Sequence, residues 1–502
     1  MFLDYIAQKE ALFPFYSQYP SLESFQAQIE LKANSYACRD VLVEVLNKQN
    51  APYPLHDRQR ENLAKLAETN CFTVTTGHQL ALATGPLYFL YKILTTLKLS
   101  EKLKAAYPAH AFVPVFWMAT EDHDFEEINH FHLFGKKYAW EKQAGGAVGN
   151  LTLEGLGEVL EKVPDFPSWL REAYMGSQNL AEATRKIVHH LFGPYGIVVL
   201  DGDDKDLKKC LQPVIARDLL EGKYAPLLRE TTASLQGAGY KSQAFVRDQN
   251  FFFLAENERS RIEKKGEEYV LVNSGTCISK ENLAQAIDTS PEVFSPNVVV
   301  RPLYQEMVLP NLAYIGGPGE LAYWLQLKGV FDTEQVPIPL LFPRNFITLI
   351  GTNIKQKMEE AGLEVRHLFL EDAAYHQLLL EKLHVEQFDF SEEEKGLELV
   401  KQHLKDKAFK ADKTLVQAAE AEMAKIAKSL GDFQKRLDKA LENKHQLDIQ
   451  KLQNIRKKLF PEGELQERHD NFLNFYINRP DFIQEIYEAL DPFHFEMNCI
   501  CL

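Results

Sequence analysis

Two hydrophobic patterns alternate along the first 390 residues. Short β-branched and aromatic runs predict buried strands, and longer stretches with apolar residues three and four apart predict helices. The strand-like runs are FTVTT at 72–76, AFVPVFWMAT at 111–120, YGIVVLDGDD at 195–204, FFFLAE at 251–256, SPNVVVRPLYQ at 295–305, LAYIGG at 312–317 and VPIPLLFPR at 336–344. Strands that are apolar on both faces and alternate with helices predict an α/β fold, a mostly parallel sheet covered on both sides.

Two stretches, at about 130–190 and 220–295, interrupt this alternation and are predicted to be insertions into the core. The second contains two strand-like runs around a charged turn, which predicts a small antiparallel unit. The three predicted regions are the core with its insertions (1–390), a helical coiled coil (391–460) and a C-terminal segment that returns to the core (461–502).

The coiled-coil prediction depends on a narrow apolar seam in a stretch without proline. The seam is formed by Met423, Ile426, Leu430, Phe433, Leu437 and Leu441, and resumes at Leu452, Ile455 and Leu459. Two long helices folded back on each other would bury it, and so would pairing with a second chain. The sequence leaves these two alternatives open.

Charge and cysteine content narrow the class of protein. The net charge of −15 disfavours broad binding to nucleic acid or to an anionic membrane. The six cysteines are scattered, which indicates a reducing compartment, and the one C-x-C pair, Cys499 and Cys501, supplies too few ligands to predict a metal site. No apolar run approaches the ~20 residues that cross a bilayer, and the N-terminus has no basic region typical of a signal peptide. We therefore expect a cytoplasmic protein.

Polar residues follow the first predicted strand. Gly77, His78 and Gln79 come directly after it, and a helix is predicted to begin at Gly85-Pro86. A strand, a polar loop and a helix N-terminus in this order favour an anionic ligand. A neutral His78 could donate a hydrogen bond to a developing carboxylate or phosphate charge; the alternative is a structural histidine bonded to backbone.

An acidic cluster, Glu121 to Asp124, follows the second strand. Asp122, His123 and Asp124 are candidates for a general base or for ligands of a divalent cation. The alternative is that acidic side chains stabilise a helix N-terminus. Four consecutive side chains cannot all converge on one point, so some of them serve this second role.

Further candidates lie near later strand ends. Gly316 and Gly317 would let backbone approach a ligand, with Glu320 in the first turn of the next helix. Arg301 and Gln305 are candidates for holding a carboxylate.

Two other polar groups are less informative. Asp201, Asp203 and Asp204 form a strand-to-helix loop of the kind that often only caps a helix. Arg468 could bind a phosphate or form a surface ion pair with Glu464 or Glu467. None of these signals alone names a reaction.

Several long motifs together resemble one family over nearly the whole chain. They are TTGHQ and TGPLYFLYKI, VPVFWMATEDHDFEEINH, NVVVRPLYQEMVLPNLAYIGGPGELAYWLQLK, PLLFPRNF and LQER. In this order they are similar to the BshC family, the cysteine ligases of bacillithiol biosynthesis. The resemblance implies a Rossmann-like core similar to class I aminoacyl-tRNA synthetases, two connecting insertions and a coiled coil that forms a homodimer.

The resemblance also implies an activity: joining cysteine to glucosaminyl-malate in the last step of bacillithiol synthesis. Residue by residue, it places the TGHQ, EDHD and GGPGE motifs in the core pocket. It places Arg468 nearer a nucleotide site at the junction with the coiled coil. ATP or ADP and Mg²⁺ are the cofactors that this reaction class suggests. No zinc is expected, because the scattered cysteines form no ligand set.

Two other functions fit parts of the sequence. A dimeric scaffold in thiol metabolism would explain the coiled coil but not the polar clusters at several strand ends. A tRNA-handling synthetase relative would explain the core, but the acidic charge disfavours it and no Lys-Met-Ser-Lys-Ser counterpart is present.

Overall fold

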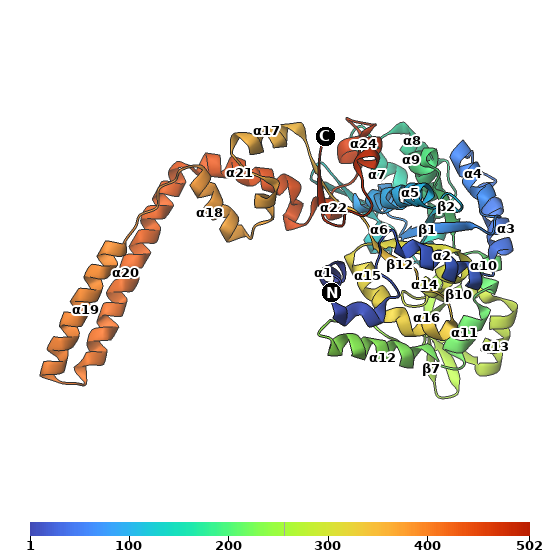
Figure 1. Ribbon diagram of the computed structural model, residues 1–502, viewed down its shortest axis with the longest axis horizontal. Helices are drawn as coiled ribbons and strands as arrows, with labels where there is room; N and C mark the ends of the chain where they lie inside the picture. The colour runs from blue at the N-terminus through green and yellow to red at the C-terminus, as the bar shows by residue number, and fades with distance from the viewer. Residues whose placement is uncertain (256) are drawn as a thin grey trace. The chain divides into compact units, whose positions relative to one another are not determined.

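The computed structural model describes residues 1–255 and 257–502 (Figure 1). The chain divides into two compact units. The core unit contains residues 1–348 and 467–500, and the helical unit contains residues 349–466 and 501–502. The second unit thus begins at Leu349, before the boundary at 391 that the change in composition suggests. Among the described helices, none combines the length and apolar character needed to cross a membrane.

A five-stranded parallel sheet forms the centre of the core unit, in the order β12-β11-β1-β2-β5. Its strands are β1 (Cys71–His78), β2 (Ala111–Met118), β5 (Val198–Asp201), β11 (Asn311–Gly316) and β12 (Leu340–Pro343). Strands β2 and β5 follow β1 outward on one side of it, and the chain then returns to place β11 on the other side of β1. This reversal creates a switch point between β1 and β11, where ligands bind in open α/β sheets. The predicted parallel sheet is confirmed.

Helices cover the sheet and extend the core unit. They are α1 (Phe2–Ile6), α2 (Ser24–Ser35), α3 (Arg39–Asn50), α4 (Asp57–Lys65), α5 (Tyr88–Ala106), α6 (Phe125–Ile128), α7 (Leu156–Glu161), α8 (Ser168–Met175), α9 (Leu180–Phe192), α10 (Lys205–Lys209), α11 (Gln212–Leu219), α12 (Tyr224–Gly237), α13 (Lys280–Thr289), α14 (Arg301–Val308), α15 (Pro318–Trp324), α16 (Lys328–Glu334), α23 (Leu473–Tyr476) and α24 (Phe482–Ala489). The first 65 residues are mostly helical.

The two insertions contain the remaining strands of the core unit. The first has a hairpin of β3 (His130–Leu133) and β4 (Lys136–Ala139). The second contributes an antiparallel sheet, ordered β10-β6-β7-β8-β9, with β6 (Phe251–Ala255), β7 (Glu258–Lys265), β8 (Glu268–Leu271), β9 (Cys277–Ser279) and β10 (Phe294–Pro296). The antiparallel prediction is confirmed. Glu256, the last residue of the predicted FFFLAE strand, lies outside the described residues.

The strand predicted over 295–305 is wrong beyond Pro296. Helix α14 begins at Arg301 instead. The Asn297 side chain accepts hydrogen bonds from the backbone N–H groups of Val299 and Val300, which forms a turn. Pro302 then stands in the first turn of the helix, where its missing N–H has no cost. These two local signals outweigh the β-branched run.

The helical unit consists of α17 (Thr352–Glu360), α18 (Asp372–Lys382), α19 (Ser391–Ala411), α20 (Leu415–Lys444) and α21 (Gln446–Leu459). Helices α19 and α20 pack side by side as a hairpin, with an ion pair of 2.5 Å between Lys405 and Glu420 (Figure 1). Helices α17, α18 and α21 share a separate apolar cluster, which includes Met358, Leu379 and Ile455. That shared cluster explains why the unit begins before the long helices. Strands β13 (Phe346–Ile350) and β14 (Met497–Cys501) and helix α22 (Gln466–His469) run across the division between units.

Candidate active site

His78 lies at the carboxyl end of β1, beside the switch point. Its ring packs against Phe89 and Tyr88 of the α5 segment, with ring centroids 4.9 and 5.3 Å away. Burial and the neighbouring Lys92 ammonium lower the pKa of His78 to about 4. The imidazole is therefore neutral near pH 7.

One hydrogen bond determines what the neutral ring of His78 offers a ligand. Its Nδ1 lies 2.8 Å from the carbonyl oxygen of Gln79. A carbonyl only accepts, so Nδ1 carries the proton and Nε2 keeps its lone pair. His78 in this tautomer accepts a proton or hydrogen bond. The geometry thus favours a base over the donor suggested by the sequence.

An ion pair at the switch point joins α5, which follows β1, to α15, which follows β11. Lys92 of α5 is 2% exposed, and its Nζ lies 2.8 and 2.9 Å from the two carboxylate oxygens of Glu320. Lys92 also donates to the carbonyl oxygen of Gly77. Glu320 further accepts from Tyr314 Oη at 2.7 Å and from the Gly317 N–H at 2.9 Å. Burial opposes ionisation, but these four contacts lower the pKa of Glu320 to about 2.

This network gives Glu320 a clear local role. Its bond to the Gly317 N–H caps α15, and its pairing with Lys92 fixes the glycine turn Gly316-Gly317 against the end of β1. Both carboxylate oxygens are already engaged by protein donors. The geometry indicates that Glu320 positions the turn, and its contact with a substrate stays a prediction.

Arg301 and Gln305 lie one turn apart on α14 and contact each other. Arg301 Nη1 donates to Gln305 Oε1 at 3.0 Å, and Nη2 donates to Tyr323 Oη at 3.3 Å. The Arg301 guanidinium lies 5.8 Å from the Tyr314 ring centroid. Gln305 is completely buried and also donates to Glu306. Arg301 is thus the partly exposed member of this pair, and the hydrogen bond from its guanidinium to the buried Gln305 orients it.

Gln79 links the end of β1 to the acidic cluster after β2. Its Nε2 donates to Asp122 Oδ2 and to Glu127 Oε2, both at 2.8 Å. Asp122 Oδ1 also accepts from the His123 backbone N–H at 2.7 Å. Burial opposes ionisation, but the hydrogen bonds from the Gln79 side chain and from the His123 backbone N–H hold the pKa of Asp122 well below its usual range. Asp122 is therefore a weak base. Asp124 is exposed and directly precedes α6.

An arginine from the second insertion fixes His123. Arg259 Nη1 lies 2.8 Å from His123 Nδ1, and its other nitrogens donate to Ser295 Oγ and to the Pro296 carbonyl, both at 3.1 Å. Arginine only donates, so Nδ1 of a neutral His123 accepts and Nε2 carries the proton. His78 and His123 thus present opposite tautomers, one with an accepting Nε2 and one with a donating Nε2.

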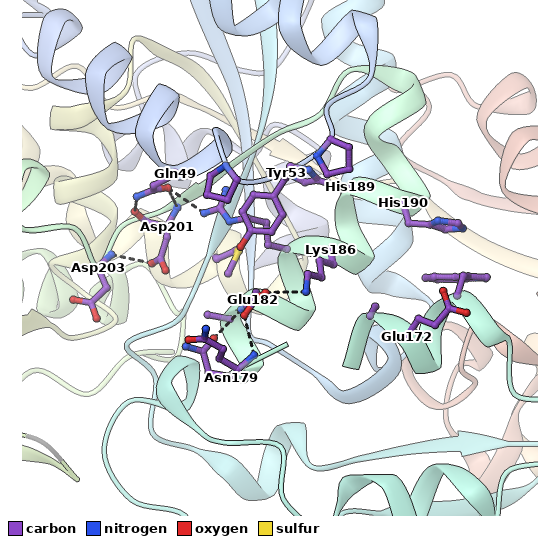
Figure 2. Close-up of a pocket in the computed structure, with 18 of the residues that line it drawn as sticks. Gln49, Tyr53, Glu172, Asn179, Glu182, Lys186, His189, His190, Asp201 and Asp203 are labelled. Carbon is purple, nitrogen blue, oxygen red and sulfur yellow. Dashed lines mark hydrogen bonds and ion pairs between the residues drawn. The ribbon is translucent and has the colours of Figure 1, made fainter. Parts of the chain in front are cut away.

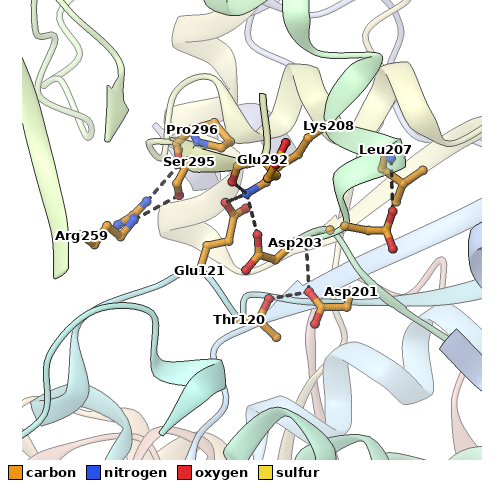
Figure 3. A network of polar contacts seen from close by, with 12 residues as sticks. Thr120, Glu121, Asp201, Asp203, Leu207, Lys208, Arg259, Glu292, Ser295 and Pro296 are labelled. Atoms are coloured by element: carbon orange, nitrogen blue, oxygen red, sulfur yellow. Dashed lines mark hydrogen bonds and ion pairs between the residues drawn. The ribbon is translucent and has the colours of Figure 1, made fainter. Parts of the chain in front are cut away.

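Glu121 belongs to a different, structural network (Figure 3). The completely buried Lys208 lies 2.7 Å from Glu121 Oε1 and 2.5 Å from Asp203 Oδ1, and it donates to the Glu292 carbonyl at 3.0 Å. Asp201 accepts a hydrogen bond from Thr120. These contacts tie the ends of β2 and β5 together. Asp204 caps α10 by accepting from two backbone N–H groups, which confirms the cap prediction for this residue, whereas Asp201 and Asp203 have the side-chain partners just described.

The loop before α5 is held in an uncommon backbone conformation. Ala83 and Thr84 have φ of 48° and 66°, and Gly85 has φ of 65°. A Cβ on Gly85 would stand 2.8 Å from the Cβ of Ala81, so only glycine fits there. Asn471 stabilises the loop by donating to the carbonyl oxygens of Ala83 and Gly85, at 2.8 and 2.6 Å.

Other protein groups contact the N-terminus of α5, where the sequence predicts an anion. The Leu87 N–H donates to the Asp470 carbonyl at 2.8 Å, and Pro86 forms a bridge with Asn471. The returning C-terminal segment therefore occupies the start of this helix. Sequence patterns did not indicate this contact because its two partners are far apart along the chain.

Arg468 lies close to Tyr88, the first residue of α5. It is exposed, and its guanidinium lies 5.9 Å from the ring centroid of Tyr88, the ring that also contacts His78. Glu467, one of the ion-pair partners suggested for Arg468, is bound by the buried Arg344 at 2.6 and 2.9 Å. Within residues 1–255 and 257–502, no group of three or more His, Cys, Asp and Glu side chains is arranged to hold a metal ion.

Lys92 and Arg259 are the main site residues that the sequence did not reveal. Lys92 stands in an apolar helix, where a lysine is usually solvated at its tip. The sequence does contain a signal for the burial of Lys92, because the residues around it in the helix are apolar or small. Arg259 stands among charged residues of a hairpin, and nothing in the pattern distinguishes it from them.

Comparison with known proteins agrees with this fold. Residues 1–345 match the family model described as "Bacillithiol biosynthesis BshC, N-terminal Rossmann-like domain". Residues 347–502 match the model described as "Bacillithiol biosynthesis BshC, C-terminal coiled-coil domain". A solved structure titled "Crystal structure of putative arginyl t-RNA synthetase from Campylobacter jejuni" matches over 82% of this chain and 100% of its own, with a TM-score of 0.21 and 12% identity, a similarity too low to bear on the fold.

Relatives match over almost their full length. A protein of Cytophaga hutchinsonii is 42% identical over 100% of this chain and 96% of its own length. A protein of Christiangramia forsetii is 40% identical over 98% and 95%, and one of Flavobacterium johnsoniae is 37% identical over 99% and 96%. All three carry the name "Putative cysteine ligase BshC". With both family models matched along the chain, this protein belongs to the BshC family of bacillithiol biosynthesis.

Proposed function

We propose that this protein is a ligase that joins the carboxyl group of cysteine to the 2-amine of glucosaminyl-malate, the last step of bacillithiol synthesis. The observation that carries the proposal is the set of oriented polar groups at the carboxyl ends of β1 and β2, in a chain whose two domains both match this family. A non-catalytic scaffold would have no need of two histidines fixed in opposite tautomers.

The chemistry requires activation of cysteine, because direct condensation of a carboxylate with an amine in water is uphill. ATP and Mg²⁺ would supply that activation. Transfer of AMP to the cysteine carboxylate releases pyrophosphate, and transfer of the γ-phosphoryl group releases ADP. The amine then attacks the activated carbonyl carbon, the C–N bond forms, AMP or phosphate leaves, and the ammonium nitrogen loses a proton.

The two histidines fit the two needs of that attack. His78 Nε2 has a lone pair and would take the proton from the attacking nitrogen. His123 Nε2 carries a proton and would donate to the oxygen that gains negative charge. Gln79 and Asp122 connect these histidines through hydrogen bonds and would hold them in place. A bound anion would raise the pKa of His78 from about 4 toward the range where a base is most effective.

Three further residues complete the proposal. Arg301 would hold a malate carboxylate, since its guanidinium is the one that Gln305 orients beside the glycine turn. Arg468 would hold a nucleotide phosphate, because it lies over the Tyr88 ring that contacts His78. Asp124 is exposed at the start of α6 and would contribute charge at the rim.

We also propose that a homodimer forms through the helical unit. Ile426 and Phe433 of the predicted seam remain 48 and 51% exposed in the α19–α20 hairpin. A second copy would cover them.

The decisive experiment follows bacillithiol by mass spectrometry after incubation with glucosaminyl-malate, cysteine, ATP and Mg²⁺. We expect product, with AMP indicating an acyl adenylate and ADP indicating an acyl phosphate. The His78→Asn variant should lose about 100-fold or more in rate while its melting temperature stays close to that of the native protein. The matched control is His110→Asn, a histidine next to the opposite end of β2. A native rate in His78→Asn would rule out the base, and no product from the native protein would rule out the ligase.

A further inference from the structure

A cavity of about 1050 Å³ in the core unit is lined by polar and aromatic side chains to which the proposed reaction assigns no role (Figure 2). Residues of α8 and α9, the segment from Gln49 to His56 and the carboxyl ends of β2 and β5 line it. Its volume is in the range of pockets that enclose small-molecule ligands. None of the contacts assigned to His78 or His123 involves this cavity.

The cavity lies on the same edge and the same face of the sheet as His78. Met118 of β2 lines the cavity and is the register partner of His78, and Asp201 of β5 lines it and is the register partner of Met118. Register partners on parallel strands project to the same face, and neighbouring strands are ~4.8 Å apart. The three side chains therefore form one row from the switch point to the cavity.

His189 is the strongest sign that a ligand binds there. It lines the cavity and is only 6% exposed, and neither ring nitrogen has a hydrogen-bond partner among the described residues. Burial and the Arg185 guanidinium lower the pKa of His189 to about 3, so the ring is neutral and has one donor and one acceptor. Buried polar atoms without partners are rare and costly, so a hydroxyl or amine of a ligand would satisfy them.

Aromatic surfaces accompany His189. The rings of Trp169 and His190 are stacked 3.9 Å apart at 12°, and Trp169 Nε1 is also without a partner in the described part of the chain. The Tyr53 ring packs edge-on against His189 at 5.4 Å. Aromatic faces next to unsatisfied polar atoms suit a ring that has C–H faces and a polar rim, as a pyranose does.

The charges of the lining argue against a phosphorylated ligand. Five carboxylates line the cavity, Glu172, Glu182, Asp201, Asp203 and Asp204, against the cations Arg185 and Lys186. Lys186 is paired with Glu182 at 2.8 Å, and Asp203 is paired with Lys208 at 2.5 Å. Among the described residues, Glu172, Asp201 and Asp204 form no ion pair, and together they outnumber Arg185. Arg185 already donates to the Val199 carbonyl and to Gln49 and Asn50 side chains. The remaining negative charge would repel a polyphosphate and attract an ammonium group.

We propose that this cavity binds the sugar ring of an amino-sugar acceptor. The hydroxyls bond to His189, the ring faces contact Trp169 and Tyr53, and the cavity carboxylates attract the ammonium group. The identity of the acceptor rests on the proposed ligase function, and the cavity would then hold the sugar while its amine is delivered along the row toward His78.

The test measures binding by isothermal titration calorimetry to the full-length protein. The probes are methyl 2-amino-2-deoxyglucoside, methyl glucoside, malate and ADP. We expect the amino sugar to bind more tightly than the glucoside, because only it has an ammonium group. His189→Phe keeps the ring shape and should raise the dissociation constant of the amino sugar about tenfold through loss of hydrogen bonds. Trp169→Ala should weaken it as well, and supplies a second variant if His189→Phe does not fold.

The controls separate this site from the rest of the protein. His110→Phe, a matched substitution next to the other end of β2, should leave amino-sugar binding unchanged. ADP binding should be the same in His189→Phe and in the native protein. Loss of ADP binding in His189→Phe, or unchanged amino-sugar binding in both cavity variants, would overturn the proposal.

Enzyme kinetics distinguish failure of this inference from failure of the ligase proposal. If the protein is the ligase, His189→Phe should raise the KM for glucosaminyl-malate about tenfold, with the KM for cysteine unchanged. Product formation with an unchanged KM would leave the ligase standing and overturn the sugar site. Amino-sugar binding that depends on His189, in a protein that forms no bacillithiol, would leave the sugar site standing and overturn the ligase.

Discussion

The parallel-sheet core and the α19–α20 hairpin bury their apolar residues to different degrees. Every residue of β1 from Cys71 to Gly77 is buried. By contrast, α19 has no buried residue among those described, and in α20 only Met423 is buried. A strand in the middle of a sheet has neighbours on both sides and helices on both faces, whereas each helix of a hairpin has one neighbour. Strand β1 is therefore covered within one chain, whereas the hairpin leaves apolar residues such as Phe433 exposed.

Removing one partner of a buried ion pair in the core should have the largest effect on the free energy of unfolding. Arg344 and Glu467 form an ion pair in which both side chains are 2% exposed. Arg344→Met would leave the Glu467 carboxylate buried without its cation, and we expect a loss of about 3–5 kcal/mol of unfolding free energy, measured by urea denaturation. The Arg344→Met/Glu467→Met double variant should lose less than the sum of the single variants. Lys405→Met, at the exposed hairpin pair, should leave the core transition unchanged. Equal effects of Arg344→Met and Lys405→Met on the free energy of unfolding of the core would contradict the comparison.

The pH dependence of stability should also arise from the core. His78 and His189 have pKa values of about 4 and about 3 in the folded state, below the ~6.5 of an unfolded histidine. As the pH falls below ~6.5, the unfolded chain binds protons that the folded chain does not, so stability falls. The slope should reach about 1.4 kcal/mol per pH unit for each histidine.

Urea titrations at pH 7 and pH 5 measure this slope. The His78→Asn/His189→Phe double variant should show a flatter dependence than the native protein. A slope that is the same in both proteins would show that these histidines are protonated in the folded state.

The strained loop before α5 provides a smaller effect. Asn471→Ala removes the hydrogen bonds that hold the Ala83 and Gly85 carbonyl oxygens. We expect a loss of about 1–3 kcal/mol, because two buried acceptors lose their donor. Thermal unfolding measures this loss, with Asn474→Ala, which removes a partly buried amide nearby, as the milder control. An unchanged melting temperature for Asn471→Ala would show that water replaces the amide.

The smallest effect on folding should come from the hairpin seam. Phe433→Asp places a charge where the side chain is 51% exposed, so the core should keep its unfolding free energy within about 0.5 kcal/mol. The same charge should weaken the proposed homodimer about tenfold or more, measured by analytical ultracentrifugation. Lys435→Asp, at an exposed position two residues further along the same helix, is the control for charge alone. An unchanged dimer would place the interface elsewhere.

The sequence predicted the elements of the site better than the contacts among them. Strand ends at His78 and Gly316 followed from local hydrophobic runs, because burial on both faces leaves a clear pattern. The strand predicted at Arg301 failed because an asparagine turn and a proline outweighed the β-branched residues. The protonation of His78 and His123 could not be predicted, since it depends on a carbonyl oxygen and on Arg259 from a distant hairpin.

The sequence by itself determined the parallel-sheet core, the antiparallel insertion, the long helices and the family, because each is written in local periodicity or in continuous motifs. Only the tertiary structure decided which polar groups meet. It paired Lys92 with Glu320, covered the start of α5 with Asp470, and placed His189 in a cavity beside the end of β5. Those outcomes depend on contacts between residues far apart along the chain, and local patterns carry no information about which distant side chain will satisfy a buried charge or hydrogen bond.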